Sequence, residues 1–207
     1  MGSSSALIES PASWWDSLAE NFLPYLTIYA EEWDSLVEEF LRHLAMTCFA
    51  VVLALIIAIF SAIQFEVEGR RAPDLFAGSG QLGIEALSRG AAHCTFVDKG
   101  REPIAVIREN LKKTRLEERA TVVQADYSSW MKTCRQQYDL ILLDPPYAEV
   151  FLETALKIVS EIDILTNSGI IVCERPFDKS LPEHIPGLVR YRDYRYGKAA
   201  VTIFRRG

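Results

Sequence analysis

Three glycines of the chain, Gly78, Gly80 and Gly83, have the spacing G-x-G-x-x-G. They follow a short apolar segment that ends at Phe76, and a helical pattern comes after them. In Rossmann-type sheets this turn offers backbone N–H groups to a nucleotide, because glycine lets the ligand approach the main chain. The spacing alone is also compatible with an ordinary loop. A true site could hold NAD, FAD or S-adenosylmethionine.

Asp98 closes the next apolar segment, about twenty residues after Gly78. A carboxylate at this place accepts hydrogen bonds from the two hydroxyls of a cofactor ribose. This position favours a nucleotide-like cofactor, although NAD and S-adenosylmethionine both satisfy it.

The sequence Asp144-Pro145-Pro146-Tyr147 distinguishes between the two cofactors. It follows the segment 138–143, which is expected to be a fully buried strand. A dehydrogenase has no use for such an ending, whereas an enzyme that methylates the exocyclic amine of a nucleobase does. An ordinary strand-ending turn is the alternative interpretation.

With these motifs the chain resembles the class I S-adenosylmethionine-dependent methyltransferases that modify amines. From about residue 60 to residue 207 it is similar to the bacterial methyltransferases that act on guanine N2 in small-subunit (16S) ribosomal RNA. The resemblance implies S-adenosylmethionine as cofactor, ribosomal RNA or a ribosomal subunit precursor as partner, and a cytoplasmic location. Residues 1–59 do not match, and the family's basic N-terminal hairpin is replaced by an acidic and apolar region.

The resemblance also implies roles for single residues. Asp74 would hold the methionine amino group of the cofactor, and Asp126 would contact its adenine amine. A helix cap or a turn is the alternative for both residues. The full set expected to bind the cofactor is Asp74, Phe76, Gly78, Ser79, Gly80, Gly83, Asp98, Lys99, Ala125 and Asp126.

The catalytic set implied by the resemblance is Asp144, Pro145, Pro146 and Tyr147. Asp144 would accept an N–H of the target amine and stabilise the positive charge that develops on it. The prolines would fix the backbone after Asp144, and Tyr147 would stack on the base. Enzymes that methylate adenine N6 or a protein glutamine usually have Asn at the position of Asp144, which argues against these alternatives.

Net charge also distinguishes the two ends of the chain. The total is −6, but residues 1–43 alone contribute −7, with eight acidic residues and one basic residue. A basic C-terminal region is typical of nucleic-acid binding, and a solvated hairpin without a partner is the alternative. The residues expected to contact RNA are Tyr147, Arg190, Arg192, Arg195 and Lys198.

Cysteine and histidine are few and scattered. The four cysteines form no C-x-x-C pair, and the three histidines stand far apart. We therefore expect reduced thiols and no metal site.

The elements that must position these residues alternate between strand and helix. The expected segments are 72–76, 81–89, 93–97, 102–114, 120–124, 127–134, 138–143, 149–161 and 169–174. Such alternation predicts an α/β fold with a mostly parallel, doubly wound sheet. Residues 188–195 and 199–205 have no helix between them and should form an antiparallel hairpin at one edge, as the class I methyltransferase resemblance also implies.

Residues 1–65 are expected to be a helical and apolar extension of the methyltransferase domain at 66–207. Residues 1–11 are polar and serine-rich, so a flexible leader or a cloning remnant is expected there. Residues 14–44 have helical periodicity, which predicts two amphipathic helices that break near Pro24. Residues 44–65 contain no charged residue, so a membrane helix is expected there, with a helix buried on the sheet or on a second copy as the alternative. A catalytically silent domain tethered by this extension is the third functional hypothesis.

Overall fold

The structure is a computed structural model of the chain and describes residues 11–146, 149–182 and 184–207. The chain divides into two compact units, and the boundary between them lies between Leu53 and Ala54. One helix, α1 (Pro11–Ala62), includes this boundary. The second unit, Ala54–Gly207, therefore begins before the predicted domain boundary at residue 65.

Helix α1 corrects the prediction for the N-terminal region. It continues through Pro24, so the predicted break between two helices is wrong. A proline removes only one N–H···O bond from a helix and does not have to end it. The apolar side chains of Trp33, Phe40 and Leu44 are exposed to solvent.

The uncharged run at 44–65 does not form one continuous helix. Helix α1 ends at Ala62, and a 3-10 turn, η1 (Gln64–Glu66), follows. Ile59, Phe60 and Ile63 belong to the hydrophobic core of the second unit, with at most 1% of their surface exposed.

Within the residues that the structure describes, no helix combines the length and apolarity needed to cross a membrane. The membrane helix expected over 44–65 stays a prediction. The alternative, packing on the sheet, applies to the last turns of α1.

Among the residues that the structure describes, seven strands form one sheet in the order β3-β2-β1-β4-β5-β7-β6. The parallel strands are β1 (Arg71–Asp74), β2 (His93–Asp98), β3 (Ala120–Gln124), β4 (Tyr138–Leu143) and β5 (Leu165–Pro176). The antiparallel strands at one edge are β6 (Leu188–Tyr196) and β7 (Ala199–Arg206). This topology confirms the predicted fold class.

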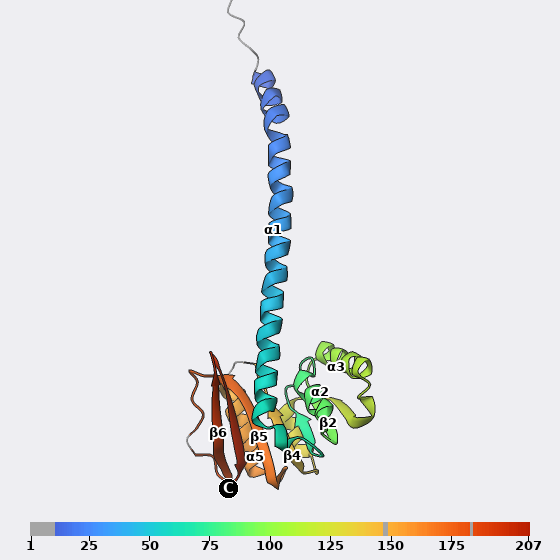
Figure 1. The fold of residues 1–207 in the computed structure, drawn as a ribbon, viewed down its shortest axis with the longest axis vertical. Coiled ribbons are helices and arrows are strands. Elements are labelled where there is room, and N and C mark those ends of the chain that lie inside the picture. The colour runs from blue at the N-terminus through green and yellow to red at the C-terminus, as the bar shows by residue number, and fades with distance from the viewer. Residues whose placement is uncertain (1–10, 147–148, 183) are drawn as a thin grey trace, which may run out of the picture. The chain divides into compact units, whose positions relative to one another are not determined.

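Helices cover both faces of the sheet (Figure 1). On one face lie the end of α1, α2 (Gln81–Ser88) and α3 (Arg101–Thr114). On the other face lie α4 (Tyr127–Thr133) and α5 (Glu149–Glu161). Strand β4 alternates between the two cores, because Leu140 and Leu142 face the first and Ile141 and Leu143 face the second. Its apolar sequence follows from burial on both sides.

The predicted boundaries agree with the structure within one or two residues in most segments. Strand β1 ends at Asp74, however, and the two residues after it form a turn. Strand β5 is longer than expected, since it begins at Leu165 and ends at Pro176. A second 3-10 turn, η2 (Glu117–Arg119), precedes β3.

The order of the strands places the predicted site. Strand β1 lies between β2 and β4. From β1 the sheet continues through β2 and β3 on one side and through β4 and β5 on the other, so the strand order reverses at β1. In open α/β sheets a crevice forms at such a switch point, beyond the carboxyl ends of the strands. Asp74, Asp98 and Asp144 stand at the carboxyl ends of these three strands.

Candidate active site

Asp74 is almost completely enclosed at the end of β1, with 1% of its surface exposed. Its Oδ2 atom accepts the Gly83 N–H at 3.0 Å. Its Oδ1 atom is buried without a hydrogen-bond partner among the described residues. A buried carboxylate oxygen is costly unless a donor reaches it. The cofactor amino group that the sequence analysis assigns to Asp74 would be such a donor.

The pKa of Asp74 reflects this enclosure. The pKa is raised to about 7, mainly by burial and also by the charges of Asp144 and Asp98, while the hydrogen bond from the Gly83 N–H opposes the rise. A cationic group bound nearby would favour the charged form again, because opposite charges stabilise each other. This cluster of carboxyl groups therefore favours a ligand with positive charge over one with a pyrophosphate.

The turn after β1 contacts the end of β2 through Asp98. Gly78 and Gly80 have φ values of 53° and 81°, a left-handed conformation that glycine adopts without strain. The N–H of Gly78 donates to Asp98 Oδ2 at 3.0 Å, and the N–H of Gly100 donates to Asp98 Oδ1 at 2.8 Å. Each carboxylate oxygen has further lone pairs, so Asp98 can hold both loops and still accept ribose hydroxyls.

Gly83 has a packing role. A Cβ atom at this position would lie 2.3 Å from Cε1 of Phe96 and 2.7 Å from Sγ of Cys94. The third glycine of this fingerprint commonly allows such close contact between helix and strand. Gly83 does not line the cavity described next, and its link to the predicted cofactor site is its N–H bond to Asp74.

A cavity of about 210 Å³ opens at the carboxyl ends of β1, β2 and β3. Six of the ten residues predicted to bind the cofactor line it, namely Phe76, Gly78, Asp98, Lys99, Ala125 and Asp126. The other four, Asp74, Ser79, Gly80 and Gly83, do not line it. The structure therefore brings most of the predicted set together around one space.

Aromatic side chains that the sequence analysis missed complete this cavity. Tyr127 and Phe151 line it, and the ring centroid of Phe76 lies 4.6 Å from Tyr127 and 6.2 Å from Phe151. Such apolar surfaces suit a planar ring of a ligand. Tyr127 follows Asp126 directly in the sequence, and that position could have identified it. Phe151 has no comparable pattern.

Asp126 caps helix α4. Its Oδ1 atom accepts the N–H groups of Ser128 and Ser129 at 3.0 and 3.1 Å and the Ser128 hydroxyl at 2.6 Å. The Ser128 hydroxyl bond contributes most to lowering the pKa of Asp126. The alternative interpretation of Asp126 as a helix cap is thus present in the structure. Its place in the cavity wall leaves the adenine contact as a prediction.

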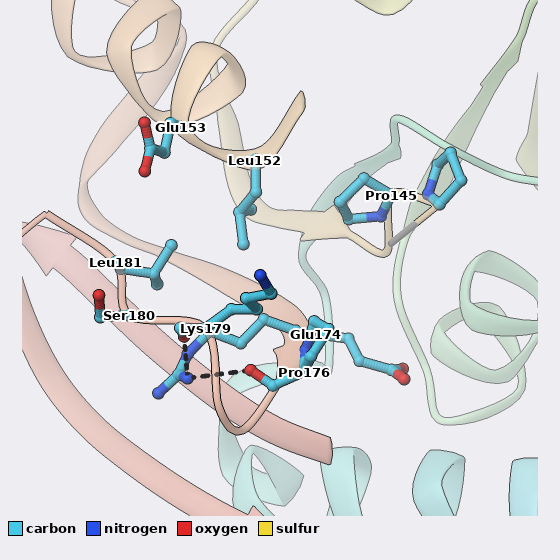
Figure 2. A pocket seen from close by; sticks show the side chains of 10 residues that line it. Pro145, Leu152, Glu153, Glu174, Pro176, Lys179, Ser180 and Leu181 are labelled. Atoms are coloured by element: carbon cyan, nitrogen blue, oxygen red, sulfur yellow. Dashed lines mark hydrogen bonds between the residues drawn. The ribbon is translucent and has the colours of Figure 1, made fainter. Parts of the chain in front are cut away.

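A second, smaller cavity, of about 30 Å³, lies beside the two prolines that follow β4 (Figure 2). The residues around it include Pro145, Pro146, Leu152, Glu174, Arg175 and Leu181. Pro146 lines this cavity as well as the first, so the two spaces adjoin. The sequence analysis missed Glu174 and Arg175, although charged residues at the carboxyl end of a central strand could have indicated them.

Two carboxyl groups of different pKa lie near the prolines. Burial raises the pKa of Asp144 to about 6. Burial and then the carboxylate of Asp144 raise the pKa of Glu174 to about 8. Of the two carboxyl groups, Glu174 therefore keeps its proton to the higher pH. Such a pair can accept hydrogen bonds at one position and donate one at the other.

Arg175 fixes the loop that borders the second cavity. Its Nη1 atom donates to the carbonyl oxygen of Lys179 at 2.6 Å, and its Nη2 atom forms an ion pair with Asp193 at 2.8 Å. Its Nε atom donates to the Thr202 hydroxyl at 3.0 Å. The loop is thereby tied to β6 and β7.

The basic residues predicted to contact RNA are all exposed on or beside β6, but they do not form one group. Arg190 donates to the carbonyl oxygens of Leu181 and Pro182, at 3.3 and 3.4 Å. The guanidinium carbon of Arg195 lies 3.9 Å from the ring centroid of Phe177. These two arginines therefore border the loop of the second cavity.

Arg192 lies at a different place. It lines a groove with Phe65 and Arg205, and its guanidinium carbon lies 4.9 Å from the ring centroid of Tyr191. Lys198 is exposed in the turn between β6 and β7, and its carbonyl oxygen accepts the Phe177 N–H at 2.7 Å. Tyr147 lies outside the described residues, so its stacking on a base stays a prediction.

Comparisons with known proteins extend over this second unit. Residues 56–205 match a family described as "Conserved hypothetical protein 95". The Bacillus subtilis protein "Putative rRNA methyltransferase YlbH" is 39% identical over 152 residues, which cover 72% of this chain and 83% of that protein. "Ribosomal RNA small subunit methyltransferase D" of Escherichia coli K12 is 30% identical over 132 residues, which cover 59% of this chain and 66% of that protein.

Solved structures with the same fold include two bacterial proteins. A "conserved hypothetical protein" of Streptococcus pyogenes superposes with a TM-score of 0.68 at 33% identity, covering 72% of this chain and 94% of that one. The Escherichia coli protein "Putative methyltransferase yhhF" gives a TM-score of 0.69 at 25% identity, covering 74% of this chain and 86% of that one.

Proposed function

Because the chain belongs to the family described as "Conserved hypothetical protein 95", whose relatives include small-subunit rRNA methyltransferases, we propose that it is an S-adenosylmethionine-dependent methyltransferase. Its proposed substrate is the exocyclic N2 amine of a guanine in small-subunit ribosomal RNA. The main support for this proposal is the position of Asp144 and the two prolines. They follow directly after β4, and Pro146 lines both cavities.

The charge of the site supports S-adenosylmethionine as the cofactor. Asp74, Asp98 and Asp144 interact through their charges, and Asp74 has a buried oxygen without a partner among the described residues. S-adenosylmethionine has an ammonium and a sulfonium group, whereas NAD would bring the two negative charges of a pyrophosphate. When bound, the cofactor supplies a methyl group that is already activated by the sulfonium.

Asp144 positions the target amine in this proposal. The lone pair of guanine N2 is delocalised into the ring, so the amine needs a preorganised acceptor to direct it toward the methyl group. An ionised Asp144 accepts one N–H and stabilises the positive charge that forms on nitrogen. With a pKa of about 6, the carboxyl is ionised at neutral pH.

The surroundings of the second cavity support an RNA substrate. A base within a helix cannot enter such a space, so the target lies in a loop or is flipped out. Arg190 and Arg195 border the loop of this cavity and are exposed, which allows them to contact phosphates. Tyr147 completes the proposed site as the residue that stacks on the base.

Transfer of tritium from labelled S-adenosylmethionine to immature small ribosomal subunits tests the function. We expect incorporation with the parent enzyme, and digestion of the RNA should yield N2-methylguanosine. N6-methyladenosine, or no incorporation, would contradict the proposal.

Asp144→Asn is the matched control for this assay, because asparagine keeps the size and removes the charge. Its turnover should fall about a hundredfold, the typical effect of losing one preorganised electrostatic contact. Its affinity for S-adenosylhomocysteine should change far less than its turnover, since Asp144 contacts the target amine in this proposal and acts on the cofactor only through its charge.

A further inference from the structure

The groove that Arg192 lines with Phe65 and Arg205 has no part in the proposed reaction. Its volume is about 130 Å³, and residues of the end of α1, η1, β5, β6 and β7 surround it. Its other lining residues are Ala62, Ile63, Glu66, Ile170, Tyr191 and Ile203. The three isoleucines are buried and make an apolar floor, whereas Phe65, Tyr191 and Arg192 are exposed.

A β-bulge in β6 brings two consecutive side chains to this groove. On β7, Ile203 and Arg205 share one face, because side chains alternate along a strand. The pairing shifts register between Arg190 and Arg192, so that Arg192 and not Tyr191 stands opposite Ile203. Such a bulge inserts one extra residue and redirects side chains. Tyr191 and Arg192 therefore both line the groove, although neighbours in a regular strand point to opposite faces.

Two guanidinium groups lie against the ring of Tyr191. The guanidinium carbon of Arg205 is 3.8 Å from the ring centroid, and that of Arg192 is 4.9 Å from it. Glu66 forms ion pairs with both Arg70 and Arg205, so its charge is compensated and the groove keeps an excess of positive charge. The Nε atom of Arg205 is buried without a hydrogen-bond partner among the described residues.

This combination of groups suits a single-stranded nucleic acid. Phe65 stands in the middle of η1 with 91% of its surface exposed, so its ring is open to a ligand. Unpaired bases stack on aromatic rings and on guanidinium planes, and phosphates accept hydrogen bonds from arginine. One exposed ring beside two arginines fits a base and its phosphates better than it fits the apolar centre of a protein interface.

The groove lies away from the proposed active site. Ile170 of the groove and Pro176 of the second cavity both belong to β5, the first near its amino end and the second at its carboxyl end. Six residues of a strand, from 170 to 176, span about 20 Å. A ligand that reaches both places must therefore be extended, as the RNA of a ribosomal subunit precursor is.

We propose that this groove binds a single-stranded segment of the substrate RNA outside the target guanine, with a base on Phe65 and phosphates on Arg192 and Arg205. This inference rests on the proposed ribosomal RNA substrate and adds a second contact region to it. It also gives a role to Arg192, which lies apart from Arg190 and Arg195. Because the groove is far from Asp144, it contributes to RNA affinity and not to the methyl transfer step.

Substitutions at Phe65 separate base stacking from apolar docking. Phe65→Ala removes the ring, Phe65→Tyr keeps an aromatic ring, and Phe65→Leu keeps only an apolar side chain. Arg192→Gln removes one exposed charge, whose Nη1 atom donates to the Tyr194 hydroxyl at 3.1 Å. Lys157→Gln is the matched control, since it removes the same charge from α5 on the other face of the sheet, where 76% of the side chain is exposed.

The measurement is the affinity for protein-free small-subunit ribosomal RNA, obtained by filter binding at several salt concentrations. Phe65→Ala and Phe65→Leu should bind roughly 5- to 100-fold more weakly than the parent, and Phe65→Tyr should match it. Arg192→Gln should bind more weakly and reduce the slope of log affinity against log salt by about 0.7. Lys157→Gln should match the parent. In tritium transfer to immature subunits, KM should rise for the weakened variants, while kcat changes far less.

Several results would overturn the inference. They are a parent that does not bind the RNA, parental affinity in Phe65→Ala or Arg192→Gln, and an equal loss in Lys157→Gln, which would indicate general charge attraction. Phe65→Leu that binds as well as Phe65→Tyr would also overturn it and would indicate a protein partner.

The binding measurement requires no methyl transfer, so it is independent of the test of the proposed function. If the parent transfers no label while the variants lose RNA affinity as expected, the proposed function fails and the groove stands as an RNA contact. If label is transferred and the variants bind RNA like the parent, the inference fails alone.

Discussion

At the residue scale, the role proposed for Asp74 predicts that cofactor binding depends on pH. Its pKa is raised to about 7, first by burial and then by the nearby carboxylates of Asp144 and Asp98. An ammonium group needs the ionised form as its partner. Binding below pH 7 must therefore remove a proton, which weakens affinity by up to about tenfold for each pH unit.

The corresponding prediction compares the parent with Asp74→Asn in calorimetric titrations with S-adenosylhomocysteine between pH 5.5 and 7.5. Affinity of the parent should rise across this range. At pH 7.5 the variant should bind S-adenosylhomocysteine more weakly than the parent by about 1.5–3 kcal/mol, the effect of losing a hydrogen bond to a charged group. Its affinity should be nearly constant across the pH range. A pH-independent affinity in the parent would show that Asp74 does not bind the amino group.

Asp74→Asn should increase the stability of the cofactor-free protein, although it weakens cofactor binding. Because the pKa is raised from 3.8 to about 7 in the folded protein, the stability contributed by this carboxyl is present below pH 3.8 and declines as the pH rises toward 7. Asparagine does not ionise. Without cofactor, the variant should thus be more resistant to urea than the parent at pH 8.

At the element scale, the contact between α2 and β2 depends on Gly83. Gly83→Ala should destabilise the protein by about 1–3 kcal/mol, because the new Cβ would overlap with Phe96 and Cys94 unless α2 moves away. Gln81→Ala is the control, since Gln81 is exposed on the same helix. Equal midpoints of urea unfolding for the two variants would contradict this account of the third glycine.

At the scale of the whole molecule, the end of α1 belongs to the domain and the residues before it do not. A chain that begins at Ala54 should keep the S-adenosylhomocysteine affinity of the full chain. It should also aggregate less, because Trp33, Phe40 and other exposed apolar side chains are removed. Light scattering and calorimetry measure the two effects.

A chain that begins at Ser61 is the matched comparison. It lacks Ile59 and Phe60, whose side chains are buried in the core. Loss of two such side chains should cost about 3–6 kcal/mol of stability. If both shortened chains were equally stable, the last turns of α1 would not be part of the core.

The sequence by itself determined the alternation of strands and helices, the glycine turn and the carboxylates at strand ends, because these features depend on local residue types and spacing. Asp74, Asp98 and Asp144 could be placed this way, since parallel strands end at one edge of a sheet. The apolar run at 44–65 could not be assigned, because whether such a run faces lipid or a core depends on distant residues. Similarly, Glu174 and Phe151 reach the two cavities only through packing of β5 and α5 against β4 and α4, contacts between segments far apart in the chain that no short motif encodes.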